Sequence, residues 1–315
     1  MACARIRSSL CKDRPRPSPE PMKPSPKQWL AFAALGIVWG STWIAADTLA
    51  ESVPPLRGAA LRFLLAALLC LPVVIRKHLK LPRGRALAFV LLLSVTMVVL
   101  PSLLVLWAQQ HTSSVTVTVL FSVMPLFVAM LRPDGVPRGA LLATVVGLGG
   151  IVLALGPSFS LDQAGGAAIA LLAVASTGAS AVLARRELRA VNPVVVTALL
   201  SATAALLLLV AAMAFERGQT MHWTRNAIAS LLFLAIVAGA PAYAAYFWLL
   251  QHLEAYKVTT VQWIEPLVAI IETAFFLRLG LSFAMIAGYL VTFTSLLLVM
   301  RARAEDDKNV SLLGN

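Results

Sequence analysis

The residue of this chain best suited to chemistry is Glu265, because its carboxyl group lies in the middle of an apolar run. It lies about eight residues into the run 258–277, which places it roughly 12 Å deep in a helix and near the bilayer midplane. Ionisable groups at that depth usually mark ion, proton or substrate pathways. We expect Glu265 to bind a substrate amine or a coupling proton, and a structural pair or a neutral hydrogen bond is the alternative. Glu272 follows seven residues later on nearly the same helix face. It could line the same pathway as Glu265, or it could have a structural role only.

Glu265 belongs to a stretch that occurs twice. The segment 251–267, QHLEAYKVTTVQWIEPL, resembles 110–126, QHTSSVTVTVLFSVMPL, at a constant offset in numbering. Pro125 and Pro266 occupy matching positions, and each removes a backbone donor and crowds the carbonyl four residues back. We predict two kinked helices that face each other beside a central cavity, with Gln262 as a polar lining residue; simple bending is the alternative. Such self-similarity in a membrane protein is typical of duplicated halves with a binding site between them.

Aromatic side chains could form the walls of this cavity. Two tryptophans follow a four-residue spacing along one side of the first apolar run, and further aromatic residues occur in the eighth and ninth runs. They could instead lie in the aromatic belt at the membrane surface. The candidate wall residues are Trp39, Trp43, Tyr243, Tyr246 and Trp263.

An outer gate is the role that we predict for Asp47 and Arg62. Both residues lie near the outer ends of their apolar runs, so an ion pair between them is geometrically feasible. The alternative is interfacial anchoring, in which the arginine side chain reaches for lipid headgroups.

The elements that must position these residues are membrane helices. Of 315 residues, 59% are hydrophobic and 13% are charged, which describes a polytopic membrane protein rather than a soluble core. We therefore predict an all-α integral membrane protein with ten transmembrane helices. Five helices per half is an odd number, so the two repeats should be inverted relative to each other. The apolar runs are 29–50, 58–75, 85–109, 114–131, 139–156, 164–184, 193–215, 227–250, 258–277 and 282–300.

The basic residues predict the orientation of the chain. With this assignment, 21 of the 26 Lys and Arg residues lie on one side of the membrane, which predicts cytoplasmic termini in the cell inner (plasma) membrane. The expected organisation is a disordered, basic, Pro-rich cytoplasmic tail over 1–28, two five-helix repeats over 29–156 and 164–300, and a cytoplasmic tail over 301–315. The net charge of +12 thus indicates orientation, and no nucleic-acid partner is expected.

The sequence carries few signatures of an enzyme. It has no HExxH motif and no phosphate-binding loop, and the short loops leave no room for a soluble catalytic domain. The three cysteines suggest neither a disulfide framework nor a metal cluster. We expect no enzymatic activity, no cofactor and no metal site, whereas the oligomeric state is undetermined.

Several short motifs resemble the drug/metabolite transporter superfamily, in particular its EamA family. They are Gly36-Ile-Val-Trp-Gly40, Leu61-Arg-Phe63, Pro125-Leu126 and Pro266-Leu267, and the resemblance covers about 29–300. It implies a ten-helix bundle of two inverted repeats around a central cavity that exports or exchanges metabolites such as amino acids, nucleobases or drugs. The Glu265-Pro266 pair is similar to the corresponding position of amino-acid exporters.

The chain departs from the family in one motif. Where the family often has Leu-Gly-Glu, this chain reads Leu279-Gly280-Leu281, and the earlier copy is contracted to Arg132-Pro-Asp134-Gly135. Those acidic residues therefore cannot be transferred to this chain.

Together these features predict a secondary transporter that exports small metabolites, amino acids or related compounds, by alternating access. Its partners would be a small-molecule substrate, the lipid bilayer and a coupling proton. A non-transporting membrane protein, such as a lipid-modifying enzyme or an assembly partner, is the alternative, and a passive channel is a third reading.

Overall fold

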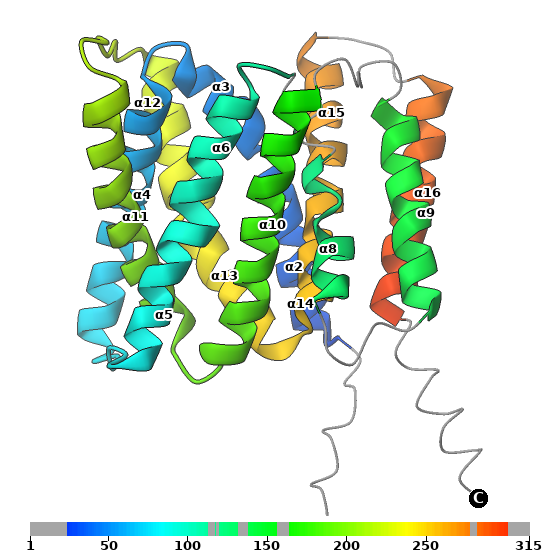
Figure 1. Cartoon of the computed structure of the whole chain (residues 1–315), viewed down its shortest axis with the longest axis horizontal. Helices are drawn as coiled ribbons and strands as arrows, with labels where there is room; N and C mark the ends of the chain where they lie inside the picture. The colour runs from blue at the N-terminus through cyan, green and yellow to red at the C-terminus, as the bar shows by residue number, and fades with distance from the viewer. Residues whose placement is uncertain are drawn as a thin grey trace, which may run out of the picture.

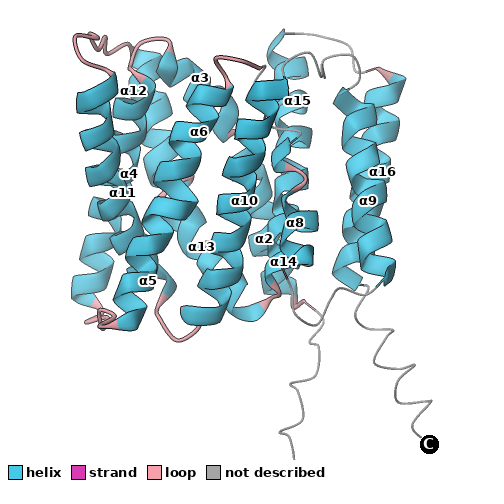
Figure 2. Cartoon of the chain, in the orientation of Figure 1, coloured by secondary structure: helices cyan, strands magenta, loops and turns pink. Residues whose placement is uncertain are grey.

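The computed structural model describes residues 24–112, 117, 120–131, 138–155, 164–277 and 282–301. Within these ranges every regular element is a helix (Figure 2), as expected for an all-α integral membrane protein. Six of these helices are long and apolar enough to cross a membrane. They are Pro26–Ala50, Pro55–Arg76, Arg85–Ala108, Gly165–Glu187, Pro193–Phe215 and Arg225–His252, and Arg138–Leu153 and Ile286–Val299 are shorter apolar helices. The count of ten helices and the inverted relation of the halves stay predictions.

The helices of the first half begin just inside the tail predicted over 1–28. Helix α2 starts at Pro26 because Ser25 and Gln28 form a capping box: Gln28 Oε1 accepts from the Ser25 N–H at 2.7 Å, and Ser25 Oγ accepts from the Gln28 N–H at 3.3 Å. The rest of the tail, the 302–315 segment and parts of the run 114–131 lie outside the described residues. The elements of this half are α2 (Pro26–Gly40), α3 (Thr42–Ala50), α4 (Pro55–Arg76), α5 (Arg85–Leu93), η1 (Ser94–Val99), α6 (Leu100–Ala108), α8 (Met124–Met130) and α9 (Arg138–Leu155).

The second half has corresponding elements. Its π-helical segment η3, like η1 of the first half, is followed after a few residues by a proline, Pro241 and Pro101 respectively, where the missing N–H favours an irregular turn. The elements are α10 (Ala164–Glu187), α11 (Pro193–Phe215), α12 (Arg225–Leu232), η3 (Phe233–Val237), α13 (Ala240–His252), α14 (Ala255–Thr259), η4 (Thr260–Trp263, a 3₁₀ turn), α15 (Ile264–Leu277) and α16 (Phe283–Arg301).

Helices from different halves pack side by side. Close pairs are α9 with α16, α4 with α11 and α6 with α10 (Figure 1). The start of α2 and the end of α16 lie at the same end of the bundle (Figure 1). Many large apolar side chains point outward, such as Leu172 at 60% and Leu206 at 63% exposure, as expected for helices that face lipid.

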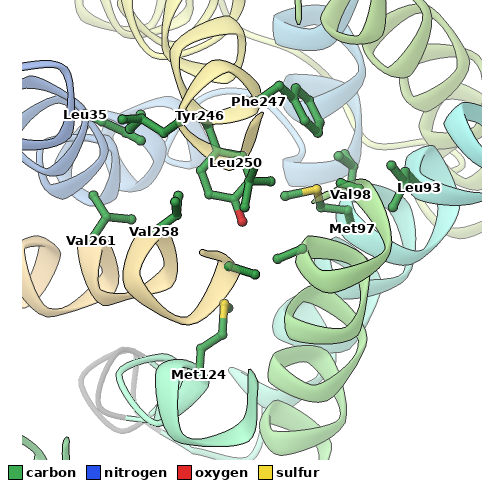
Figure 3. Close-up of a cluster of buried hydrophobic side chains, with 14 of the residues drawn as sticks. Leu35, Leu93, Met97, Val98, Met124, Tyr246, Phe247, Leu250, Val258 and Val261 are labelled. Atoms are coloured by element: carbon green, nitrogen blue, oxygen red, sulfur yellow. The ribbon is translucent and has the colours of Figure 1, made fainter. Parts of the chain in front are cut away.

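The core lies where the helices of both halves meet. Figure 3 shows Tyr246 and Leu250 of α13 between Leu35 of α2 and Met97 of η1. All four side chains are buried in one hydrophobic cluster. The interior is therefore formed jointly by the two halves, and it surrounds the polar residues described next.

Candidate functional site

A cavity of about 230 Å³ lies between the helices of the two halves. Its lining includes six of the seven residues predicted to form a pathway, which are Trp39, Trp43, Tyr243, Tyr246, Gln262 and Glu265. Further polar lining residues, which the sequence did not single out, are Thr42, Ser102, Thr177 and Thr259. The structure thus brings together groups from α2, α3, α6, α10, α13, α14, η4 and α15.

Glu265 lies in the first turn of α15 and is 6% exposed. Its Oε1 atom is buried and makes no hydrogen bond of normal length and direction among the described residues. The indole Nε1 of Trp43 also lacks such a bond, although it approaches this carboxyl group. An unpaired buried polar atom costs about 1–3 kcal/mol. A ligand that donates a hydrogen bond to the carboxyl group would therefore bind favourably here.

Two glycines bring the first helix against this carboxyl-bearing helix. A Cβ atom added at Gly36 would lie 2.7 Å from Cβ of Ile264, and one added at Gly40 would lie 2.5 Å from Cβ of Val268 and 3.0 Å from the backbone oxygen of Glu265. No larger side chain fits at this approach without displacing α15. The short motif Gly36-Ile-Val-Trp-Gly40 thereby sets the distance between the aromatic wall and Glu265.

Arg62 also lines the cavity, although we predicted it at an outer gate. Its guanidinium lies 4.6 Å from the centre of the Phe63 ring, and that ring packs against Tyr243 of α13 with 5.8 Å between the ring centres. Asp47 is exposed on α3, and the structure shows no ion pair between Asp47 and Arg62, although both are described. The sequence could be used to predict how far along their helices Asp47 and Arg62 lie, but not the rotation of α4, which turns Arg62 towards the cavity.

Trp263 is the predicted wall residue that the cavity lining does not include. Its side chain is fully buried, its Nε1 donates to the backbone oxygen of Ser122 at 2.8 Å, and its ring packs against Gly147 of α9. Successive side chains of the 3₁₀ turn η4 point about 120° apart, so Gln262 and Trp263 cannot both face the cavity. Gln262 therefore faces the cavity while Trp263 faces α9.

The two repeated prolines lie in the first turns of α8 and α15, where each helix starts again after an irregular segment. These breaks contact each other: the Ser122 hydroxyl, before Pro125, donates to the Gln262 carbonyl, before Pro266, at 3.4 Å. The carbonyl that Pro266 leaves without its helical donor is thus bonded to the opposite break rather than directed into the cavity.

At the end of the bundle nearer α14, two helix termini cap each other. Arg185 of α10 donates to the carbonyl oxygens of Leu250 and Leu253, where α13 ends. In return, Gln251 donates to the carbonyl oxygens of Leu188 and Val191, where α10 ends, at 3.3 and 2.7 Å. The leucines between them are at most 5% exposed. The ends of α10 and α13 are therefore joined at this end of the bundle, and in the sequence only the repeated glutamine pointed to this feature.

The described residues contain no group of three or more His, Cys, Asp or Glu side chains that could hold a metal ion. The chemistry available to the cavity is thus that of a carboxyl group, a guanidinium, hydroxyls, an amide and aromatic rings. Such a set binds and orients a small polar molecule.

The comparisons with known proteins agree with a transporter fold. The model of the EamA-like transporter family matches twice, over residues 26–156 and 164–301. The chain is 24% identical to the uncharacterized transporter YoaV of Bacillus subtilis strain 168, over 78% of this chain and 86% of the relative. It is 26% identical to the uncharacterized inner membrane transporter YedA of Escherichia coli strain K12, over 76% of this chain and 80% of the relative.

One solved crystal structure superposes with a TM-score of 0.75 at 15% sequence identity, covering 89% of this chain and 99% of the other. At 15% sequence identity, this similarity supports the fold and nothing further. The two family matches together account for most of the chain, including every residue of the cavity lining. The chain therefore belongs to the EamA-like transporter family.

Proposed function

We propose that this membrane transporter is a secondary carrier that exports small metabolites with an amino group, amino acids or related compounds, by alternating access. The observation that carries the proposal is the buried carboxyl group of Glu265, whose Oε1 atom makes no hydrogen bond of normal geometry among the described residues, in a cavity that Arg62 also lines. Buried charges inside a membrane protein are costly and are usually functional.

The two charged groups favour a zwitterionic substrate. Glu265, Arg62 and Tyr243 line the same cavity, and the structure, which describes both charged residues, shows no ion pair between Glu265 and Arg62. A substrate ammonium beside Glu265 and a substrate carboxylate on the Arg62 guanidinium would neutralise both groups at once. Trp39 and Trp43 supply aromatic faces that favour a nearby cation.

The size of the cavity favours a small metabolite. Its volume of about 230 Å³ is below the roughly 300–1,000 Å³ of sites for drug-sized ligands. Polar lining groups alternate with Phe63, Val98 and Val261, so the site suits a molecule with a charged head and a short apolar part.

Alternating access is supported by the duplicated family match and is compatible with the bonded termini of α10 and α13 at one end of the bundle. We infer ten transmembrane helices in two inverted repeats, related about an axis in the membrane plane. The mutual capping by Arg185 and Gln251 would hold the cytoplasmic side shut while the cavity takes up or releases substrate on the other side.

The proposed location is the inner membrane, as a multi-pass protein with both termini in the cytoplasm. The basic segment between α4 and α5, with Lys77, Lys80 and Arg83, lies at the same end as the start of α2 and the end of α16 (Figure 1). Positive charge gathers on the cytoplasmic side of membrane proteins. The name of the relative YedA as an inner membrane transporter points the same way.

The test is counterflow with the purified protein in liposomes, with pooled radiolabelled amino acids and, separately, pooled nucleobases. We expect saturable exchange of amino acids that Glu265→Gln reduces by at least about tenfold, because a neutral amide cannot balance an ammonium charge. Glu187→Gln is the matched control, since that carboxyl group pairs with Arg85 outside the cavity and should leave exchange unchanged.

Two results would contradict the proposal. Absence of exchange for every pool, with folded and correctly oriented protein, would favour a non-transporting membrane protein. Flux that follows the gradient without saturating would indicate a passive channel. Normal exchange in Glu265→Gln would retain the carrier and remove this carboxyl group from its mechanism.

A further inference from the structure

Two methionines are the longest unbranched side chains in the apolar part of the cavity lining. Met97 belongs to η1 and Met124 to α8, and their side chains are 7% and 1% exposed. Figure 3 shows them extending towards the middle of one buried cluster from different sides. Methionine is unbranched and has a polarizable thioether, so it adapts to neighbours of different shape. The cavity therefore has an adaptable apolar wall.

Helix α10 holds the segment that carries Met97. The Ser176 hydroxyl donates to the carbonyl oxygen of Thr96 at 2.5 Å, and the hydroxyl oxygens of Thr96 and Ser180 lie 2.7 Å apart. These two contacts attach η1 to one side of α10. Because η1 is π-helical, a form that often occurs at functional sites, its attachment fixes where Met97 enters the cavity lining.

The same turn of α10 also positions Met124. A Cβ atom added at Gly178 would lie 3.5 Å from Cγ of Met124 and 3.1 Å from Cγ2 of Val128, so the glycine leaves room for α8. Thr177 lines the cavity, and the residues before and after it point about 100° to either side, since a helical turn has 3.6 residues. The elements that carry the two methionines thus flank Thr177.

The wall between the two methionines offers no hydroxyl proton to a substrate. Thr177 donates its proton to the carbonyl oxygen of Ala173 in the same helix, at 2.9 Å. The charged groups of the cavity come from other helices: Glu265 lies on α15, which packs against α2, and Arg62 lies on α4, whereas η1 and α8 pack against α10. The charged and the apolar parts of the cavity are therefore on different elements.

We propose that Met97 and Met124 bind the side chain of the substrate and select neutral amino acids with a medium-sized apolar side chain, such as leucine. The inference rests on the transport function proposed above and deepens it. With the substrate ammonium at Glu265 and the carboxylate at Arg62, the side chain on the α-carbon is left to the apolar wall. A polar side chain would lose its hydrogen bonds to water there, and a very short one would bury little apolar surface.

The test measures counterflow of single radiolabelled amino acids in liposomes that contain the wild-type protein. Leucine and asparagine have side chains of similar size but different polarity, whereas alanine is smaller. We expect the transport efficiency, the maximal rate divided by the half-saturation concentration, to be at least about tenfold higher for leucine than for the other two, since one methylene in an apolar pocket is worth about 10–200-fold. Equal efficiency for leucine and asparagine, or for leucine and alanine, would overturn the proposal.

Met124→Ala and Met97→Ala are two independent variants that enlarge the apolar part of the cavity. In each, we expect the efficiency for tryptophan relative to leucine to rise about tenfold or more. Met130→Ala is the matched control, because Met130 also lies on α8 but is 76% exposed, and it should leave the order of substrates unchanged. Glu265→Gln should lower the efficiency for all amino acids by a similar factor, because they share the ammonium group.

The thermal stability of each variant is measured beside transport, and either methionine variant suffices if the other does not fold. An unchanged order of substrates in the folded variants would overturn the proposal. So would an equal loss for every amino acid, because a purely structural role of the methionines produces that result. A wild-type protein that exchanges no amino acid would instead refute the transport function, and this subsite with it.

Discussion

Gly40→Ala is expected to push α15 away from α2 and to disturb the cavity without touching any of its polar groups. The added methyl carbon would lie 2.5 Å from Cβ of Val268 and 3.0 Å from the backbone oxygen of Glu265. A Cβ atom and a backbone oxygen cannot move aside as the tip of a long side chain can. The helices must therefore separate, and the Glu265 carboxyl group moves with α15.

The magnitude follows from the two opposing effects of the substitution. Overpacking a well-packed contact costs about 1–3 kcal/mol, whereas alanine is favoured over glycine inside a helix by up to about 1 kcal/mol. Because Gly40 is the last residue of α2, the gain should be small. We expect a net loss of about 1–2 kcal/mol, or a fall of roughly 2–8 °C in apparent Tm.

The assay is thermal unfolding of the purified protein in detergent, with counterflow measured on the same variants. Gly149→Ala is the matched control, because Gly149 also lies within an α-helix and nothing lies within 4 Å of its added Cβ atom. It should be as stable as the wild-type protein or more so. Equal stability of Gly40→Ala and Gly149→Ala would refute the close contact between α2 and α15.

Two further predictions concern the ends of the bundle. The first is measured as the labelling rate of a cysteine placed at Leu253 in an otherwise cysteine-free chain. The double variant Arg185→Ala with Gln251→Ala should raise this rate by about tenfold, since each lost hydrogen bond is worth about 0.5–1.5 kcal/mol. The exposed His252→Ala should leave that rate unchanged, and equal rates in both would contradict closure by mutual capping. Glu216→Ala should lower the free energy of unfolding by about 1–3 kcal/mol, because the buried Glu216 carboxylate accepts from the first two N–H groups of α4 at 2.7 and 3.0 Å. Glu216→Gln should restore part of this loss. An alanine variant as stable as the wild-type protein would contradict the role of Glu216 as a cap of α4.

The positions of the helices could be predicted because local features determine them. The run 193–215 coincides with α11, whose first turn is fixed by Pro193 and by the Asn192 side chain that accepts from the Val194 N–H at 2.9 Å. Apolar length, capping residues and proline are all read directly from neighbouring residues. The same features underlie the agreement between the run 85–109 and the helix Arg85–Ala108.

The directions of individual side chains could not be predicted with the same certainty. Arg62 faces the cavity rather than Asp47, since the rotation of α4 is set by its packing against α11. Trp263 faces α9, since neighbouring residues of a helical turn point in different directions and Gln262 is the one that faces the cavity. A hydrogen bond from the Ser41 hydroxyl to Glu272 joins residues 231 positions apart, and no local pattern indicates such a contact.

The pairing of helices across the two halves also bears on how the protein is made. Helix α9 meets α16, and α4 meets α11, so the main neighbour of each of these early helices belongs to the second half and is synthesised later. Thr292 of α16 donates to the Gly147 carbonyl of α9 at 3.2 Å, and Glu265 enters the membrane only after more than three quarters of the chain has been made. We therefore expect the first half to be in the bilayer before its partner helices have been synthesised, with its inner faces in contact with lipid. The cavity should then be assembled late in biosynthesis.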